Sequence, residues 1–265
     1  MAGLLARVGE KVEEYFARAQ SVICRETVRV QSLGADLLGD GSTARQVVSD
    51  LRIAWLPATD DDPTPEANVL RDVVSVNGRP PRPKDKAGCM DPKPVSPEPL
   101  AILLPSQQHK YKFNWAGLGR VDGHAAAMVD YRSIESGPIQ VSPRDPPVDD
   151  CFEIELPGKT RGRVWIDQET GDVLRFDEGL TGIFDVDLPS DARGRPRQAL
   201  SVVVERADVS IRYKRVAFQD PVETLMLPAS IDTLTVIRSS GVPRVRKTQV
   251  FSHYRRFVTD GRIIQ

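Results

Sequence analysis

The chain has 265 residues, of which 40% are hydrophobic and 28% are charged, and its formal net charge is −1 at pH 7. This composition is typical of a globular protein with a substantial core, and the near-neutral charge gives no argument for binding nucleic acid or an anionic membrane. No apolar run approaches the roughly 18–20 residues that a membrane-spanning helix needs, so no transmembrane segment is predicted. Charge is unevenly divided, because the residues from Ser201 onward carry eleven Lys and Arg against six Asp and Glu.

The first residues of the chain bear on the cellular location of the protein. Charged residues at Arg7 and Glu10 occupy the region where a secretion signal would have an apolar stretch. The chain is therefore interpreted either as a cytosolic protein or as the mature segment of an exported protein, restarted at an added Met.

An amphipathic helix is predicted over residues 4–19. Apolar residues recur there at helical spacing, while Glu10, Glu13 and Glu14 lie on the opposite side. A helix lying on a membrane surface is the alternative, but its polar face would be basic rather than acidic. We therefore expect this helix to pack on the concave side of a sheet.

Residues 21–31 alternate between apolar and polar positions, which predicts a β-strand. Cys24 and Val28 belong to its apolar face, and Glu26 lies between them. Two interpretations of this carboxylate are open. It meets an Arg near an end of the sheet, which we favour, or it supplies a polar group inside a cavity.

A β-hairpin over residues 161–176 organises the middle of the chain. Val164 and Ile166 lie on its first arm and Val173 and Phe176 on its second. The polar turn between the arms contains Gly171, which can take positive φ. The hairpin is predicted to lie in the middle of an antiparallel sheet.

Strands dominate most of the remaining sequence. Alternating segments include residues 46–56, 68–76, 110–115, 125–134, 200–209, 210–218, 229–237 and 245–257. About ten or eleven strands are expected in all, without the βαβ alternation of Rossmann or TIM folds. The predicted fold class is α+β: a strongly curved antiparallel sheet, or half-barrel, packed on an N-terminal helix and a short second helix.

Residues 79–99 contain seven prolines in twenty-one positions, too many for a helix or a central strand. This segment is either a linker between domains or a loop that lies against the body of the protein. Cys89 within it and a short helical pattern at residues 100–104 favour the loop. We therefore predict a single domain over residues 1–265.

The three cysteines lack the C-x-x-C spacing of zinc knuckles and thioredoxin-type centres. Cys24 is predicted to be a buried free thiol on the apolar face of its strand. Cys89 and Cys151 lie in or beside proline-rich loops that have little else to anchor them, so a disulfide between them is predicted. Such a bond would place the protein in an oxidising compartment. Three unrelated free thiols in a cytosolic protein are the alternative.

The sequence contains no catalytic or metal-binding signature, so no enzyme activity, cofactor or metal is expected. Gly158-Lys159-Thr160 matches the end of a phosphate-binding loop, but Glu153 stands where that motif requires Gly. The three histidines are far apart, and none has a second ligand at metal-binding spacing. Large apolar side chains could instead line a cavity, with ordinary core packing as the alternative for each; these candidates are Trp55, Tyr111, Phe113, Trp115, Met128 and Trp165.

The order of helix and strands, together with the hairpin motif W-I-D-x-x-T-G-x-V-L-R, resembles the lipoprotein-carrier superfamily of the Lol type. This LolA/LolB-like superfamily includes the outer-membrane lipoprotein carrier and receptor and periplasmic regulators of envelope stress. The matching segments are Trp165-Ile166-Asp167, Thr170-Gly171, Val173-Leu174-Arg175 and Asp185-Val186-Asp187. Later segments are similar to uncharacterised exported bacterial relatives; they are Ile211-Arg212-Tyr213, residues 221–231 and Tyr254-Arg255-Arg256-Phe257.

The resemblance implies a curved sheet over helices, with an apolar cavity that receives acyl chains. The first functional hypothesis is accordingly a non-enzymatic periplasmic protein that binds a lipid, an acyl chain or a lipidated protein. The second is an envelope module for protein interaction or stress sensing, whose cavity is filled by its own side chains. In both hypotheses the protein is exported and its partner is a lipid or an envelope protein, not a nucleic acid.

Overall fold

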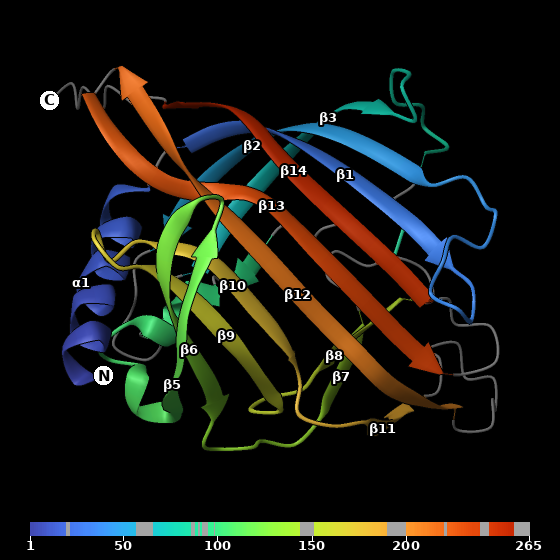
Figure 1. The fold of residues 1–265 in the computed structure, drawn as a ribbon. Coiled ribbons are helices and arrows are strands. Elements are labelled where there is room, and N and C mark those ends of the chain that lie inside the picture. The colour runs from blue at the N-terminus through green and yellow to red at the C-terminus, as the bar shows by residue number, and fades with distance from the viewer. Residues whose placement is uncertain are drawn as a thin grey trace, which may run out of the picture.

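The computed structural model describes residues 1–19, 22–56, 66–85, 88–89, 91, 95–97, 99–143, 151–189, 200–219, 222–238 and 244–256. No helix in these ranges is long and apolar enough to cross a bilayer. The elements of these ranges are shown in Figure 1. In chain order they are α1 (Ala2–Arg18), β1 (Val22–Leu33), β2 (Arg45–Leu56), β3 (Glu66–Val76), β4 (Val95–Pro97), the 3-10 helices η1 (Pro99–Leu103) and η2 (Gln108–Lys110), β5 (Tyr111–Val121), β6 (His124–Ser133), β7 (Gln140–Pro143), β8 (Phe152–Glu155), β9 (Thr160–Asp167), β10 (Val173–Leu180), β11 (Phe184–Leu188), β12 (Leu200–Gln219), β13 (Val222–Arg238) and β14 (Arg244–Arg256).

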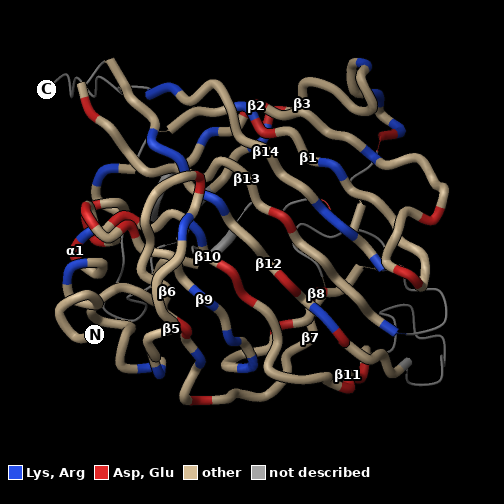
Figure 2. Tube along the Cα trace, viewed as in Figure 1, with Lys and Arg blue, Asp and Glu red and all other residues tan. Residues whose placement is uncertain are grey.

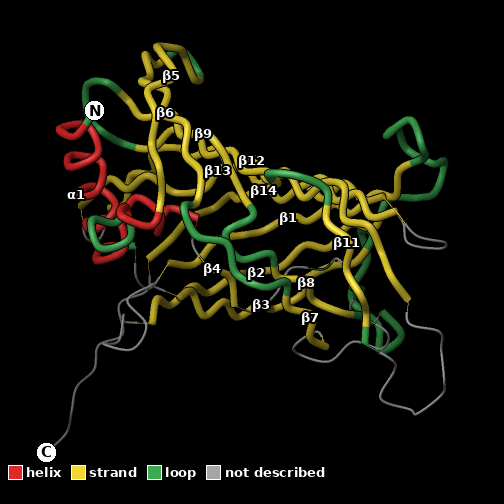
Figure 3. The backbone as a smooth tube through the Cα atoms, turned by 90° about the horizontal axis from the view of Figure 1, so that it is seen from below, coloured by secondary structure: helices red, strands yellow, loops and turns green. Residues whose placement is uncertain are grey.

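Twelve of these strands form one sheet in the order β4-β3-β2-β1-β14-β13-β12-β10-β9-β6-β5, with β11 paired to β12. Strands β7 and β8 form a separate two-stranded sheet. Strands from both sides of the proline-rich segment share the large sheet, because β14 pairs with β1. The sheet curves so strongly that β2 and β3 lie beneath β12, β13 and β14 in Figure 3. The predicted curved antiparallel sheet with an N-terminal helix is thus confirmed.

Strand β12 differs from the prediction of two strands over residues 200–209 and 210–218. It runs without interruption for 20 residues. Its register with β13 shifts between Val204 and Arg206 and again between Arg212 and Tyr213. Such bulges insert a residue into the ladder and increase the local bend and twist. The strand therefore follows the curvature of the sheet without an intervening loop.

We call the side of the sheet that faces α1 the inner face and the opposite side the outer face. Helix α1 buries the apolar stripe that the sequence predicts. The buried side chains of this stripe are Val8, Val12, Tyr15 and Phe16. It packs against η1 and against inward-facing residues of the strands in one continuous cluster. The side chains of this cluster that are no more than 1% exposed include Val8, Leu103, Val129, Val164, Ile166 and Phe176.

Helix α1 lies in close contact with η1, the short second helix predicted after the proline-rich segment. A Cβ atom at Gly9 would lie 3.1 Å from the carbonyl oxygen of Leu103 and 3.0 Å from Nε2 of Gln108. Gln108 Nε2 donates hydrogen bonds to the carbonyl oxygens of Leu5, over 3.0 Å, and Leu103, over 2.7 Å. The glycine therefore lets the two helices approach closely enough for one amide to join them.

The structure contains the predicted disulfide between Cys89 and Cys151, whose Cα atoms are 5.3 Å apart. It links the proline-rich segment to the start of β8 across a sequence separation of 62 residues. Closing a loop of that length stabilises a fold by roughly 4 kcal/mol in the chain-entropy model. Cys24 is buried and free, and burial raises the pKa of its thiol to about 12. That thiol is therefore a poor nucleophile at neutral pH.

Candidate functional site

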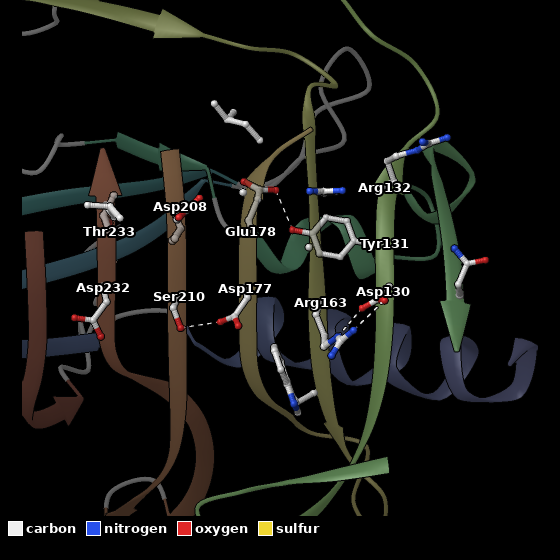
Figure 4. A pocket seen from close by; sticks show the side chains of 18 of the residues that line it. Asp130, Tyr131, Arg132, Arg163, Asp177, Glu178, Asp208, Ser210, Asp232 and Thr233 are labelled. Atoms are coloured by element: carbon white, nitrogen blue, oxygen red, sulfur yellow. Dashed lines mark hydrogen bonds and ion pairs between the residues drawn. The ribbon is translucent and has the colours of Figure 1, made fainter. Parts of the chain in front are cut away.

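An open groove lies on the outer face of the sheet, on the side away from α1 (Figure 4). Its volume is about 1260 Å³, and its lining comes from β5, β6, β9, β10, β12, β13 and β14. Most of the side chains that line it are charged or polar. Figure 2 shows acidic and basic residues distributed over the strands of this face.

A row of polar side chains crosses the middle of the groove. Asp130, Arg163, Asp177, Ser210 and Asp232 occupy paired positions on five neighbouring strands, and Figure 4 shows them in line. Arg163 donates two hydrogen bonds to Asp130, over 2.6 and 3.0 Å, and Ser210 donates one to Asp177 over 2.7 Å. The hydrogen bonds to Asp130 raise the pKa of Arg163. The other two carboxylates of this polar row have partners outside it, because Asp177 pairs with Arg175 and Asp232 accepts a hydrogen bond from Thr248.

A second row on the same face contains only cations. Lys112, Arg132 and Arg161 are directly paired across β5, β6 and β9, and all three are exposed. In the described part of the chain none of them forms an ion pair or donates a side-chain hydrogen bond. Like charges in directly opposite positions of a sheet repel one another. We call these three residues the basic row, and they make this end of the groove positive.

Two of the predicted cavity residues, Met128 and Trp165, lie on the outer face in paired positions on β6 and β9. The Trp165 ring is half-buried beside two guanidinium groups. Its centroid is 4.7 Å from Cζ of Arg175 and 5.8 Å from Cζ of Arg163. These distances are those of cation–π contacts. Trp165 therefore lines the charged groove with one part of its ring system and packs against the small apolar cluster of Val121, Ala126 and Leu174.

The other predicted cavity residues are placed differently. Tyr111 and Phe113 are half-buried on the inner face and pack against the core cluster, with ring centroids 6.3 Å apart. Trp115 is paired with Val129 on the same face, yet it is 53% exposed. Trp55 belongs to β2, and its side chain lies outside what the structure describes. The sheet separates Tyr111, Phe113 and Trp115 from the two residues of the outer face.

A partly buried polar contact on the inner face crosses three strands. Tyr131, Gly162 and Glu178 occupy paired positions on β6, β9 and β10. A Cβ atom at Gly162 would lie 2.6 Å from the Tyr131 hydroxyl, so only glycine lets the tyrosine pass over β9. That hydroxyl donates a 2.9 Å hydrogen bond to Oε2 of Glu178. Burial raises the pKa of Glu178, and burial together with this carboxylate raises the pKa of Tyr131.

The inner face also holds Glu26, whose side chain is fully buried. Its Oε2 atom lies 2.9 Å from Nε of Arg71, and its Oε1 atom accepts a 2.8 Å hydrogen bond from Gln249. The carboxylate meets an Arg, as the favoured interpretation expects, but it does so within β1, between β2 and β14, rather than near an end of the sheet. Its neighbour Cys24 belongs to a small cluster with Leu51 and other apolar residues.

The basic row and the polar row were not predicted as a site. Their residues are ordinary outward-facing positions of separate strands, and only the pairing of β5, β6 and β9 brings them together. The available signal was the alternation of Lys110, Lys112 and Asn114 with aromatic residues. Among the residues that the structure describes, no group of three or more His, Cys, Asp and Glu side chains could hold a metal ion.

No family model and no curated protein matches the sequence. Among solved structures, a DUF1329 family protein from Desulfovibrio piger gives a TM-score of 0.46 at 10% identity, over 97% of this chain and 93% of that chain. A putative outer membrane lipoprotein-sorting protein domain from Vibrio parahaemolyticus gives 0.44 at 10% identity, over 96% and 94%. A LolA superfamily protein from Nitrosomonas europaea gives 0.38 at 10% identity, also over 96% and 94%.

The superfamily that the sequence resembles is among these matches. The structure itself shows a curved antiparallel sheet with an N-terminal helix packed on it. At these identities and TM-scores, however, the likeness does not say what the chain binds. Its function therefore has to be inferred from its own residues.

Proposed function

We propose that this chain is a non-enzymatic periplasmic binding protein that engages an envelope protein through the outer face of its half-barrel. The observation that carries the proposal is the contrast between an open, charged groove on the outer face and a packed inner face. Polar grooves with unpaired charges favour protein partners whose surface has the opposite charge.

The packing of the inner face supports a self-filled interior. Val8 of α1 and Leu103 of η1 are 0% exposed, as are Val129, Val164 and Ile166 of the sheet. The Glu26–Arg71 ion pair occupies the interior near β1, β2 and β3. An acyl chain that entered there would have to separate two buried charges or lie against them, which is unfavourable in a low-dielectric site.

The periplasmic location is supported by the disulfide between Cys89 and Cys151, because such bonds persist in oxidising compartments. The proposal expects one reactive thiol per chain, from Cys24, when the protein is denatured without reductant. Three reactive thiols in protein taken directly from its native compartment would contradict this location.

A lipid or acyl chain on the inner face is the second candidate function. It is favoured by Tyr111 and Phe113, which are half-buried at the margin of the core cluster. Displacement of α1 would expose its own buried residues Val12 and Phe16 and the part of the core cluster that they cover. In this second function, α1 would act as a movable cover for an apolar cavity.

Lipid extraction separates the two functions. Protein purified from the envelope without detergent is extracted with organic solvent, and acyl species are quantified by mass spectrometry against the protein. The proposed function predicts far less than one lipid per chain. A stoichiometric acyl species that disappears in a Phe113→Asp variant with an unchanged circular dichroism spectrum would replace it with the second.

Site-specific photo-crosslinking tests the partner. A photoreactive amino acid at Asn114, which lines the groove, should give discrete crosslinked proteins in cells. The same amino acid at Arg52, which is exposed on β2 away from the groove, is the control. Equal patterns from both positions would remove the groove as the docking face.

A further inference from the structure

We propose that the free edge of β5 receives an extended acidic segment of the protein partner, which pairs with the strand while the basic row holds its carboxylates. This inference rests on the proposed function and specifies how its partner binds. The first observation is the position of β5 at one end of the sheet order, where it pairs with β6 alone among the described strands. Such an edge presents unpaired backbone N–H and C=O groups, to which another strand can add.

The second observation is the charge beside that edge. Lys112 lies on β5 itself, and Arg132 and Arg161 follow at paired positions inward from the edge. Some other charges of this face have partners, as in the Arg163–Asp130 and Arg175–Asp177 pairs, whereas Arg246 of the groove and Arg29 of β1 form no ion pair in the described part of the chain. The basic row lacks such neighbours in the described part of the chain. A carboxylate from outside the chain would relieve the repulsion between these three cations.

The third observation concerns the other face of the same edge. Phe113 and Trp115 point to the inner side of β5, and Trp115 is 53% exposed there. Because successive residues of a strand face opposite sides, an added strand would place every second side chain beside Lys112 and the others beside Trp115. The complementary segment therefore alternates between acidic and apolar residues.

The length of the docking edge is limited by a bulge. The register between β5 and β6 shifts between Trp115 and Gly117, and Gly117 has a φ of 108°. A bulge of this kind twists the edge and interrupts its ladder. The continuous edge therefore covers Tyr111 to Trp115, enough for a segment of about five residues.

The basic row has a competing explanation, since a lysine on an edge strand discourages pairing with other chains. That explanation accounts for Lys112 but not for Arg132 and Arg161, which lie one and two strands inward. It also predicts that no peptide adds to the edge. A binding experiment therefore distinguishes the two.

The test is a fluorescence anisotropy titration with a labelled peptide of alternating Glu and Val, in which the full chain is titrated into the peptide. The proposal predicts saturable binding that weakens with salt, and loss of binding when every Glu is replaced by Lys. It also predicts loss of binding when alternate peptide nitrogens are methylated, because methylation removes the backbone donors of a paired strand but leaves the charges.

Arg132→Glu is the decisive variant, with Arg29→Glu as its matched control. Both residues are exposed cations on the outer face, but Arg29 lies on β1, away from the edge. Arg132→Glu should weaken binding by about tenfold or more, and Arg29→Glu by less than about twofold. Equal effects of the two variants, or unchanged binding of the methylated peptide, would overturn the proposal.

Two further outcomes keep this inference separate from the proposed function. Crosslinks from Asn114 without any binding of the alternating peptide would remove the edge-pairing mode and leave the outer face as the docking surface. Binding to phosphatidylglycerol vesicles that is lost in Arg132→Glu, with no peptide binding, would assign the basic row to a membrane surface and overturn the peptide proposal.

Discussion

The two faces of the same strands differ sharply in what they do with polar groups. On the inner face, Phe176 and its neighbours form a nearly solvent-free core, and Glu26 is buried with its own partners. On the outer face, Asp177 follows Phe176 immediately in β10 and joins the exposed polar row. Because side chains alternate along a strand, one sequence segment builds both surfaces. The difference indicates that stability depends on the inner face, and recognition on the outer face.

The largest contrast is expected between adjacent residues of β10. Phe176→Ala should lower the free energy of unfolding by about 3–5 kcal/mol, because it removes a fully buried ring and leaves a cavity. Asp177→Ala should lower the free energy of unfolding by less than about 1 kcal/mol, because the ion pair between Asp177 and Arg175 is partly exposed. Urea unfolding followed by circular dichroism measures both. Similar costs for the two substitutions would break the comparison between the faces.

A smaller loss is expected from the buried ion pair of the inner face. Glu26→Ala should lower the free energy of unfolding by about 3 kcal/mol, because it removes the fully buried carboxylate that pairs with the Arg71 guanidinium. Adding Arg71→Met to Glu26→Ala should recover part of this loss, because the guanidinium that has lost the Glu26 carboxylate is then removed. The same urea unfolding measurement applies to the single and double variants. A double variant no more stable than Glu26→Ala would show that the pair has a different role.

The smallest predicted effect depends on pH and involves Glu178. Burial raises the pKa of this carboxyl above its ordinary value of 4.5, so the folded protein holds the proton more tightly than the unfolded chain. The free energy of unfolding should therefore decrease as pH rises from about 4.5 through the raised native pKa. Glu178→Gln removes this decrease and still accepts the hydrogen bond from Tyr131.

Unfolding measured at pH 4 and pH 7 tests that expectation. Glu178→Gln should be more stable than the wild type at pH 7, and the two proteins should converge at pH 4. Tyr131→Phe is the control, because it leaves the titrating carboxyl in place. A Glu178→Gln variant that is less stable at pH 7 would mean that the ionised carboxylate stabilises the fold.

Local patterns predicted the parts of the fold that depend on local periodicity. The stripe containing Val8, Val12 and Phe16 predicted α1, and the hairpin turn at Gly171 predicted the β9–β10 connection. The continuity of β12 could not be predicted, because its bulges depend on the curvature of the whole sheet. A period-2 pattern indicates alternation but not how a distant partner strand bends it.

The same limit explains why the candidate site could not be predicted from the sequence. Residues 125–129 are apolar on both sides of their strand, and only Asp130 and Arg132 further along mark the side of Met128 as the polar one. The face of Met128 follows from its pairing with Trp165, which lies 37 positions later in the sequence. The basic row likewise exists only through the pairing of three strands. The aromatic candidates were therefore predicted from residue type alone. Predicting the groove would have required the register in which the strands pair.

The central claim is that the interior is filled by the protein's own side chains, so that binding takes place on the outer face. The most direct test is a titration of the native protein with a fluorescent fatty acid, 11-(dansylamino)undecanoic acid. The account predicts no saturable binding to the wild type at concentrations well below those at which the probe forms micelles. Saturable binding with one probe per chain, which quenches tryptophan fluorescence and is lost in Phe113→Asp while circular dichroism is unchanged, would contradict it.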